Sequence, residues 1–303
     1  MPALLGAGRD SLIHQALLYG SETEFTEEAL AFLAEGRGAD DALVVIAPPD
    51  RIDLLRPGLP PECEFREAAG YFTTPPRSIA TAVSVGRDRW WKDGGRVRVV
   101  AEQVWKGRDP VEVREWKRFE ALVNVVFAGT RTSLLCAYDL RTVPSDVMRI
   151  VERTHHGLDY EPPARVYAEL DRAPLLPQTG QVAHRGFVRG ELPGLRDFTA
   201  KAAAVFGLTA AMPLIMAVNE VATNIIKHGG GSGSLLVWSD GGAVICDLLD
   251  PVGRVEDRFL GFLPPSPDQP SGAGMWMVRQ LCDLVEIRSG GTGTIFRLTA
   301  RLP

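Results

Sequence analysis

The sequence of 303 residues contains no long hydrophobic run, no Cys-x-x-Cys pair and no excess of positive charge. No apolar stretch approaches the roughly 20 residues of a membrane-spanning helix, and the first residues lack the basic start of a signal peptide. The formal net charge of −5 gives no indication of binding to nucleic acid or to an anionic membrane. We therefore expect a cytoplasmic protein that contacts neither directly.

The four cysteines are isolated from one another and from histidines at the spacing of a zinc site. They are Cys63, Cys136, Cys246 and Cys282. Neither a zinc site nor a disulfide framework is indicated, and each cysteine is most simply a small buried hydrophobic residue.

The first half of the chain alternates strand patterns with helix patterns. Strands are predicted at residues 13–19, 42–47, 96–101 and 133–138, and helices at residues 25–35, 111–127 and 144–153, with a short helix starting at residues 48–50. This alternation predicts a three-layer α/β domain with a largely parallel sheet. Ligands of such sheets lie at the carboxyl ends of the strands, which here means near Tyr19, Glu102 and Tyr138-Asp139.

The turn after the first strand does not have the composition of a phosphate-binding loop. Such a loop would read Gly-x-x-x-x-Gly-Lys-Ser/Thr, but this chain has Gly20-Ser-Glu-Thr-Glu24. With no lysine and two acids, Glu22 and Glu24, the turn would repel a triphosphate. We expect this domain not to bind ATP.

Several residues of the first half carry a family resemblance. They are His14, Tyr19, Glu102, Trp105, Glu120, Asn124 and Cys136-Ala-Tyr138-Asp139. With this set, residues 11–157 resemble the MEDS sensory domain. The resemblance implies a RecA-like fold without a phosphate loop, and it implies sensing of a small molecule. The candidate ligand-binding residues are His14, Tyr19, Glu102, Tyr138 and Asp139. A purely structural role for each of them stays open, and the resemblance does not identify the signal.

A proline-rich stretch, residues 161–182, is predicted to be a semi-rigid connector with at most one short element within it. It would separate a sensory domain, residues 1–160, from a second domain, residues 183–303. No histidine-bearing helical hairpin of the histidine-kinase type precedes the second domain. His155 and His156 directly follow a predicted helix, and we interpret them as a polar helix end.

The second domain is organised around a helix predicted at residues 211–226. Glu220 and Asn224 lie four residues apart on it, so both side chains leave the same helical face. A carboxylate and an amide so placed can hold a hydrated Mg²⁺ and orient a hydroxyl. Glu120 and Asn124 have the same spacing, so the sequence that follows each pair has to distinguish them.

A glycine-rich stretch follows Asn224, and then a hairpin is predicted with strands at residues 235–239 and 243–249, the second ending on Asp250. Gly272-Ala-Gly274 then starts a helix, and two further strands are predicted at residues 284–288 and 294–298. This order resembles the GHKL ATP-binding fold, an α+β histidine-kinase-like sandwich. Within it, the resemblance is closest to the anti-sigma serine kinases of bacterial partner switching, over residues 182–303. Nothing comparable follows Glu120, so we interpret that segment as ordinary helix.

The resemblance implies a role for each matched residue. Asn224 would bind the Mg²⁺ that bridges the ATP phosphates, and Glu220 would take the proton from the accepting serine. Asp250 would accept a hydrogen bond from the adenine amino group. Gly272 and Gly274 would let backbone amides approach the phosphates, and Thr294 would lie near the adenine, with an ordinary strand role equally open.

One motif departs from the family pattern. The resembled kinases continue from the aspartate with Asp-x-Gly-x-Gly, whereas this chain has Asp250-Pro-Val-Gly253-Arg254. Val252 stands where a glycine is expected, and Gly253 is displaced by one residue. Two hypotheses therefore stay open. The chain is either a serine/threonine kinase that binds a sigma factor and/or its antagonist, or a non-catalytic module that sequesters such a partner. Retention of Glu220 and Asn224 favours the kinase. A homodimer is possible in either case.

Overall fold

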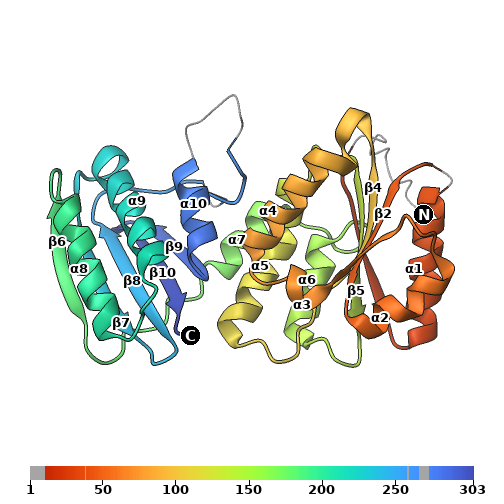
Figure 1. Ribbon diagram of the computed structural model, residues 1–303, viewed down its shortest axis with the longest axis horizontal. Coiled ribbons are helices and arrows are strands. Elements are labelled where there is room, and N and C mark those ends of the chain that lie inside the picture. The colour runs from red at the N-terminus through yellow and green to blue at the C-terminus, as the bar shows by residue number, and fades with distance from the viewer. Residues whose placement is uncertain (1–10, 38, 258, 266–272) are drawn as a thin grey trace. The chain divides into compact units, whose positions relative to one another are not determined.

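The computed structural model describes residues 11–37, 39–257, 259–265 and 273–303. The chain divides into two compact units, Met1–Arg172 and Ala173–Pro303 (Figure 1). Among the described helices, none has the length and apolar character needed to cross a membrane.

The first unit is built on a five-stranded sheet in the order β1-β5-β4-β2-β3, with every pairing parallel. Its strands are β1 (Ile13–Tyr19), β2 (Ala42–Ala47), β3 (Glu64–Glu67), β4 (Val97–Glu102) and β5 (Thr132–Asp139). Helices α1 (Glu22–Arg37) and α2 (Pro49–Leu55) lie on one side of the sheet (Figure 1). Helices α4 (Pro75–Val85), α5 (Pro110–Val126) and α6 (Ser145–Thr154) lie on the other side. The three-layer α/β prediction is confirmed.

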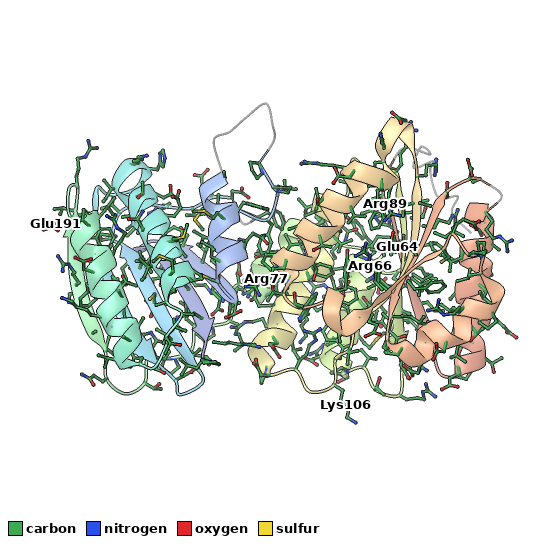
Figure 2. The ribbon with its side chains drawn as sticks, viewed as in Figure 1. Glu64, Arg66, Arg77, Arg89, Lys106 and Glu191 are labelled. Carbon is green, nitrogen blue, oxygen red and sulfur yellow. The ribbon has the colours of Figure 1, made fainter. Side chains whose placement is uncertain are left out.

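The sequence did not predict β3, because this edge strand is short and carries charges on three of its four residues. Glu64 pairs with Arg66 of the same strand and with Arg89, and these side chains lie close together in Figure 2. Charged side chains on an edge strand discourage pairing with a second chain.

The helices of the first unit are α1 (Glu22–Arg37), α2 (Pro49–Leu55), α3 (Ala68–Tyr71), α4 (Pro75–Val85), α5 (Pro110–Val126), α6 (Ser145–Thr154) and α7 (Pro163–Leu170). Short η segments lie at Arg56–Gly58, Gly86–Trp90 and Lys92–Gly94. At the start of α1 the Ser21 hydroxyl accepts from the Glu24 amide, and Glu24 accepts from the Gly20 amide. These two bonds cap the start of the helix, and the return bond from Glu24 reaches Gly20 and not Ser21.

Helix α7 lies within the segment that the sequence predicts as a connector. It starts with Pro163 at its first position, where proline suits a helix. Its buried Val166 packs with Ala121 and Ile150 of the first unit. Helix α7 is thus the one short element that the prediction allowed within this segment, and the boundary between the two units falls after Arg172.

The second unit contains a five-stranded antiparallel sheet in the order β6-β7-β8-β10-β9. Its strands are β6 (Ala183–Val188), β7 (Ser232–Ser239), β8 (Ala243–Asp250), β9 (Leu284–Gly290) and β10 (Gly293–Arg301). Helices α8 (Leu192–Val205), α9 (Met212–His228) and α10 (Ala273–Leu281) share one apolar core with the sheet, and α9 lies in the middle (Figure 1). The predicted α+β class is confirmed.

The opposite face of this sheet carries a buried ion pair and a strap of chain. Arg297 donates to both carboxylate oxygens of Asp247, at 2.7 and 2.8 Å. It also donates to the Leu176 carbonyl at 2.6 Å, and Gln178 donates to Asp247 at 3.0 Å. Residues 173–179 are thereby held on the sheet of the second unit.

Candidate functional site

A cavity of about 320 Å³ in the second unit lies between α9, the start of α10 and the ends of β8 and β10. Six of the residues predicted from sequence line it, namely Glu220, Asn224, Asp250, Gly253, Gly274 and Thr294. A seventh, Gly272, lies outside the described residues. Residues spread over 75 positions of sequence therefore meet in one place.

Helix α9 presents the two polar residues because its other face is buried. Leu214, Val218 and Val221 are at most 1% exposed and pack in the core, which turns Glu220 and Asn224 toward the cavity. Glu220 lies against the first turn of α10, where helix amides carry partial positive charge. A negative side chain is favourable at that end of a helix.

Asp250 ends β8 and is only 4% exposed. Its Oδ1 accepts hydrogen bonds from three backbone amides, those of Gly253 (2.7 Å), Val252 (3.1 Å) and Gly230 (3.2 Å). A Cβ built on Gly229 or Gly253 would come within 1.8 or 2.0 Å of Asp250 Oδ2. Both positions therefore need glycine.

The displaced glycine of the Asp250 motif now has a structural explanation. Val252 is 70% exposed, and its backbone is not in the left-handed region that favours glycine. The turn after Asp250 thus places Pro251 and Val252 outside, and Gly253 makes the close approach to the carboxylate. Val252 does not stand where a glycine is needed.

Thr294 holds this turn in place. Its hydroxyl donates to the Gly253 carbonyl at 2.8 Å and lies 2.9 Å from the Ser289 hydroxyl. Ser289 in turn accepts from the Val255 amide at 2.9 Å. The chain of hydroxyls ties residues 253–255 to β9 and β10, so the contacts of Thr294 are with the protein backbone and with Ser289.

The residues lining the cavity fit an adenine nucleotide with Mg²⁺. One end offers a carboxylate and an amide oxygen on α9, the oxygen ligands that Mg²⁺ prefers. The other end offers the Asp250 carboxylate next to apolar side chains on which a flat ring could pack. Those side chains are Ile225, Val255, Leu260, Met275 and Phe296.

In the first unit, the structure brings Tyr19, Glu102 and Asp139 together around Arg51, a residue that the sequence did not single out. The Tyr19 hydroxyl donates to Glu102 at 2.9 Å, and Arg51 Nε donates to that hydroxyl at 3.1 Å. Arg51 also lies 3.7 Å from Glu102 and 3.5 Å from Asp139. The carboxyl ends of β1, β4 and β5 thus share one guanidinium.

Carboxylates outnumber the cation at this position. Arg51 contacts Glu22 and Asp50 as well, at 3.3 and 3.0 Å. Burial raises the pKa of Glu102 to about 7, whereas the hydrogen bond from Arg141 holds the pKa of Asp139 below its usual value. The place where a RecA-type fold would hold phosphate is thus filled by an arginine surrounded by acids.

His14 and Tyr138, the other two predicted ligand-binding residues, belong to a second, fully buried group with Glu120, Cys136 and His155. His14 Nε2 lies 3.4 Å from Cys136 Sγ, and His155 Nε2 lies 3.4 Å from the Tyr138 hydroxyl and 3.8 Å from Glu120 Oε2. Burial lowers the pKa of both histidines and raises that of Glu120 to about 8. The predicted ligand set therefore divides into two clusters.

The Glu120 segment is helical as expected, and the structure adds that its carboxylate is completely buried next to His14, Cys136 and His155. One interpretation from sequence needs correction. His155 is 0% exposed and is not a polar helix end, although its Nδ1 does bond the Val151 carbonyl of α6. Neither position has a local sequence signal, because its neighbours come from distant strands.

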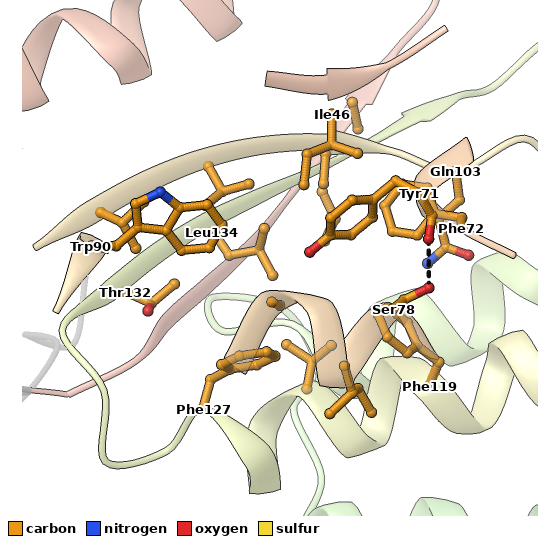
Figure 3. Close-up of a pocket in the computed structure, with 18 of the residues that line it drawn as sticks. Ile46, Tyr71, Phe72, Ser78, Trp90, Gln103, Phe119, Phe127, Thr132 and Leu134 are labelled. Carbon is orange, nitrogen blue, oxygen red and sulfur yellow. Dashed lines mark hydrogen bonds between the residues drawn. The ribbon is translucent and has the colours of Figure 1, made fainter. Parts of the chain in front are cut away.

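Next to this cluster lies an apolar cavity of about 60 Å³ that the sequence analysis did not anticipate (Figure 3). This is roughly four to six times the space that one water molecule needs. Trp90, Phe119, Phe127 and Leu134 are among the side chains around it (Figure 3). Gln103, Cys136 and Tyr138 also line it, so it adjoins the buried cluster.

Comparison with known proteins gives two family matches. Residues 13–156 match the MEDS family, described as "MEthanogen/methylotroph, DcmR Sensory domain". Residues 189–300 match the histidine kinase-like ATPase domain. No curated protein matches the chain.

One similar solved structure is that of the RsbU and RsbW domains of Rv1364c from Mycobacterium tuberculosis. It is 17% identical, with a TM-score of 0.29, and the match covers 41% of this chain and 32% of that one.

Proposed function

We propose that this chain, which joins a MEDS sensory domain to a histidine kinase-like ATPase domain, is a signal-responsive anti-sigma regulatory factor. In this proposal it binds a sigma factor and/or its antagonist, and it transfers the terminal phosphate of ATP to a serine or threonine of the antagonist. The observation that carries the proposal is the meeting of Glu220, Asn224 and Asp250 in one cavity.

Each end of the cavity has a proposed task. Asn224 holds Mg²⁺ through its amide oxygen, and Glu220 accepts the proton of the attacking hydroxyl. When bound, ATP would supply the terminal phosphoryl group and leave as ADP, and Mg²⁺ would neutralise charge on the phosphates. The Asp250 carboxylate selects adenine by accepting from its amino group, and Gly229 and Gly253 keep the backbone close to that carboxylate.

The positions of the histidines favour an acceptor on another protein. The chain has five histidines. Those of the first unit lie on β1 or just after α6, and the remaining two lie on β6 and at the last position of α9. None lies in the middle of a helix, where a histidine kinase carries its phosphoacceptor. We therefore favour transfer to a hydroxyl of a partner.

The first unit supplies the signal in this proposal. Its apolar cavity suits a small apolar molecule, because the lining consists mainly of aromatic and aliphatic side chains. The carboxylates around Arg51 disfavour a triphosphate at the strand ends. ATP is accordingly assigned to the second unit alone.

A second candidate function is a non-catalytic module that sequesters its partner under control of the sensory domain. Asp250 Oδ1 already accepts from three backbone amides, and Gly229 and Gly253 lie against Oδ2. A carboxylate engaged in this way could serve the fold alone and leave nucleotide binding weak.

Two variants of α9 separate the candidates. Asn224→Ala removes a proposed metal ligand, so Mg·ATP binding and phosphate transfer should both fall. Glu220→Gln keeps the size but cannot accept a proton, so transfer should fall about 100-fold or more while binding stays. Asn219→Ala is the matched control, because Asn219 lies on the same helix and pairs with Arg196.

The measurements are phosphate incorporation into a candidate antagonist and direct Mg·ATP binding on the same samples. Equal transfer by wild type and Glu220→Gln would remove Glu220 from the mechanism. No transfer by wild type to any cognate antagonist, with partner binding intact, would establish the sequestering module.

A further inference from the structure

We propose that His14, Glu120, Cys136 and His155 form a buried binding site for one divalent transition-metal ion of the zinc class. The four side chains come from β1, α5, β5 and the residue after α6. Each offers one ligand atom, and these four atoms all lie within 4.8 Å of one another. All four residues are at most 7% exposed.

The spacing of the ligand atoms suits a tetrahedral ion. Bonds of about 2.0–2.3 Å to nitrogen, oxygen and sulfur place neighbouring ligands of a tetrahedral site roughly 3.3–3.7 Å apart. His14 Nε2 and Cys136 Sγ are 3.4 Å apart, and His155 Nε2 and Glu120 Oε2 are 3.8 Å apart. Only modest contraction of the longer separations is needed.

Both histidines are oriented as metal ligands usually are. A ligating imidazole donates its other N–H to a carbonyl or amide oxygen, which fixes its tautomer. His14 Nδ1 lies 3.2 Å from Asn124 Oδ1, and His155 Nδ1 lies 2.8 Å from the Val151 carbonyl. With the protons on Nδ1, both Nε2 lone pairs point to the same small space.

Among the residues that the structure describes, only one of the two carboxylate oxygens of Glu120 accepts a hydrogen bond. Glu120 Oε1 accepts from Gln103 Nε2 at 2.9 Å, but Oε2 has no hydrogen-bond partner within the described chain. A completely buried carboxylate oxygen without a donor is costly. A cation next to it would supply the missing interaction, and Cys136 thiolate with Glu120 carboxylate would balance a charge of +2.

The ligand types indicate the class of metal. Two imidazoles and a thiolate suit borderline to soft ions such as Zn²⁺ and exclude Mg²⁺ and Ca²⁺, which prefer oxygen. Cys136 also lines the apolar cavity, so the site and the cavity share a side chain. Occupancy of one is therefore expected to affect the other.

Cobalt(II) gives a direct test on the chain of 303 residues, produced without a histidine tag. Co²⁺ reports tetrahedral geometry through its ligand-field bands and cysteine ligation through thiolate-to-cobalt charge transfer. We expect one Co²⁺ per chain, displaced by Zn²⁺, with both signals present. Cys136→Ser should lose the charge-transfer band, and Cys63→Ser, a change at another buried cysteine, should keep it.

Further variants keep the proposal testable if Cys136→Ser fails to fold. Single replacement of Cys63, Cys246 or Cys282 by alanine should leave the charge-transfer band intact. Asn124→Ala, which removes the partner of His14 Nδ1 together with the amide that donates to the Glu120 and Thr154 carbonyls, should weaken Co²⁺ binding about 10–100-fold. A folded wild-type chain that binds no Co²⁺ or Zn²⁺, or a band that survives Cys136→Ser, would overturn the proposal. Neither readout depends on phosphate transfer.

Discussion

The backbone of Gly274 lies directly against the carboxylate of Glu220. A Cβ built on Gly274 would stand 2.0 Å from Glu220 Oε1 and 2.8 Å from its carboxyl carbon. The start of α10 and the proposed base of α9 are thus fitted to each other without room for a methyl group.

Gly274→Ala should therefore displace the Glu220 carboxylate by about 1 Å. A displacement of that size costs roughly 100-fold in rate when the displaced group reacts. We expect phosphate transfer to fall by this factor while the domain stays folded, since alanine otherwise favours a helix over glycine. Gly291→Ala is the control, because a Cβ built on Gly291 meets no other residue within 4 Å. Unchanged transfer by Gly274→Ala would contradict the assignment of Glu220.

The turn after Asp250 gives a second test. Gly253→Ala would place a Cβ 2.0 Å from Asp250 Oδ2 and 3.0 Å from the Gly229 Cα, so the turn must open. ATP binding should weaken at least about tenfold, which corresponds to about 1.4 kcal/mol. Val252→Ala, on the exposed neighbour, should leave the affinity unchanged. Calorimetric titration of both variants with ATP tests whether the close approach to Asp250 is made at residue 253 or at residue 252. A larger loss of affinity in Val252→Ala than in Gly253→Ala would show that Val252 occupies the critical position.

Strands with a continuous or alternating hydrophobic pattern could be predicted from the local sequence, and strands without such a pattern could not. The bounds of β1 and β2 were predicted without error, and β2 is the continuous hydrophobic segment expected of a buried parallel strand. Strand β6 was missed because only Phe187 among its residues is buried. The six residues that the order of motifs singled out line one cavity of the second unit, since that fold brings them together by element order, and their binding of a nucleotide stays a prediction.

Long-range contacts were not predictable in the same way. Arg51 occurs in the first turn of a short helix, like many solvated arginines. Of its four acidic partners only Asp50 is a sequence neighbour, and the other three come from distant parts of the chain. Glu120 and Asn124 have the same spacing as Glu220 and Asn224. Only the packing of α5 against β1 and β5 shows that the first pair is buried.

Arg51 should be a main determinant of the stability of the first unit. Arg51→Met leaves Glu102, Tyr19 and Asp139 without their shared cation, and loss of one partner of a buried pair costs about 3–5 kcal/mol. Urea unfolding followed by circular dichroism should show this loss. Arg141→Met, which removes an exposed partner of Asp139, should change little. An effect of Arg51→Met no larger than that of Arg141→Met would disprove the central role of Arg51.

Glu102 should make the stability of the first unit depend on pH. Burial raises its pKa from 4.5 to about 7, beside Tyr19, Arg51, Asp50 and Asp139. The folded state then binds more protons than the unfolded state between these values. The free energy of unfolding should fall as pH rises from about 4.5 to about 7, and the contribution should be constant above.

The upper limit of this effect is about 3.5 kcal/mol, since a tenfold difference in proton affinity corresponds to about 1.4 kcal/mol. Glu102→Gln cannot titrate, so its unfolding free energy should lose this part of the slope. The check is the wild-type minus variant difference, measured from pH 4 to pH 8. A difference that does not change with pH would show that Glu102 titrates normally.

The contacts of residues 173–179 with the sheet of the second unit predict how truncation of the chain affects this unit. Residues 173–303 should fold alone, because the hydrophobic core of the second unit is formed entirely by residues of this unit. Every residue that lines the 320 Å³ cavity also lies beyond residue 219. Residues 183–303 should also fold but be less stable by roughly 1–3 kcal/mol. The shorter piece loses the Leu176 carbonyl that Arg297 binds and the Gln178 amide that Asp247 binds.

Thermal unfolding of the two pieces, with ATP binding measured on each, tests this prediction. The Asp247–Arg297 pair remains in both, which should limit the damage to the face of the sheet that carries this pair and leave the cavity beside α9 intact. Arg297→Lys in the longer piece is a control that weakens both the ion pair and the strap, so it should cost more than the truncation. If the longer piece aggregated, the second unit would depend on the first, and the division of the chain into a sensory and a nucleotide-binding part would have to be abandoned.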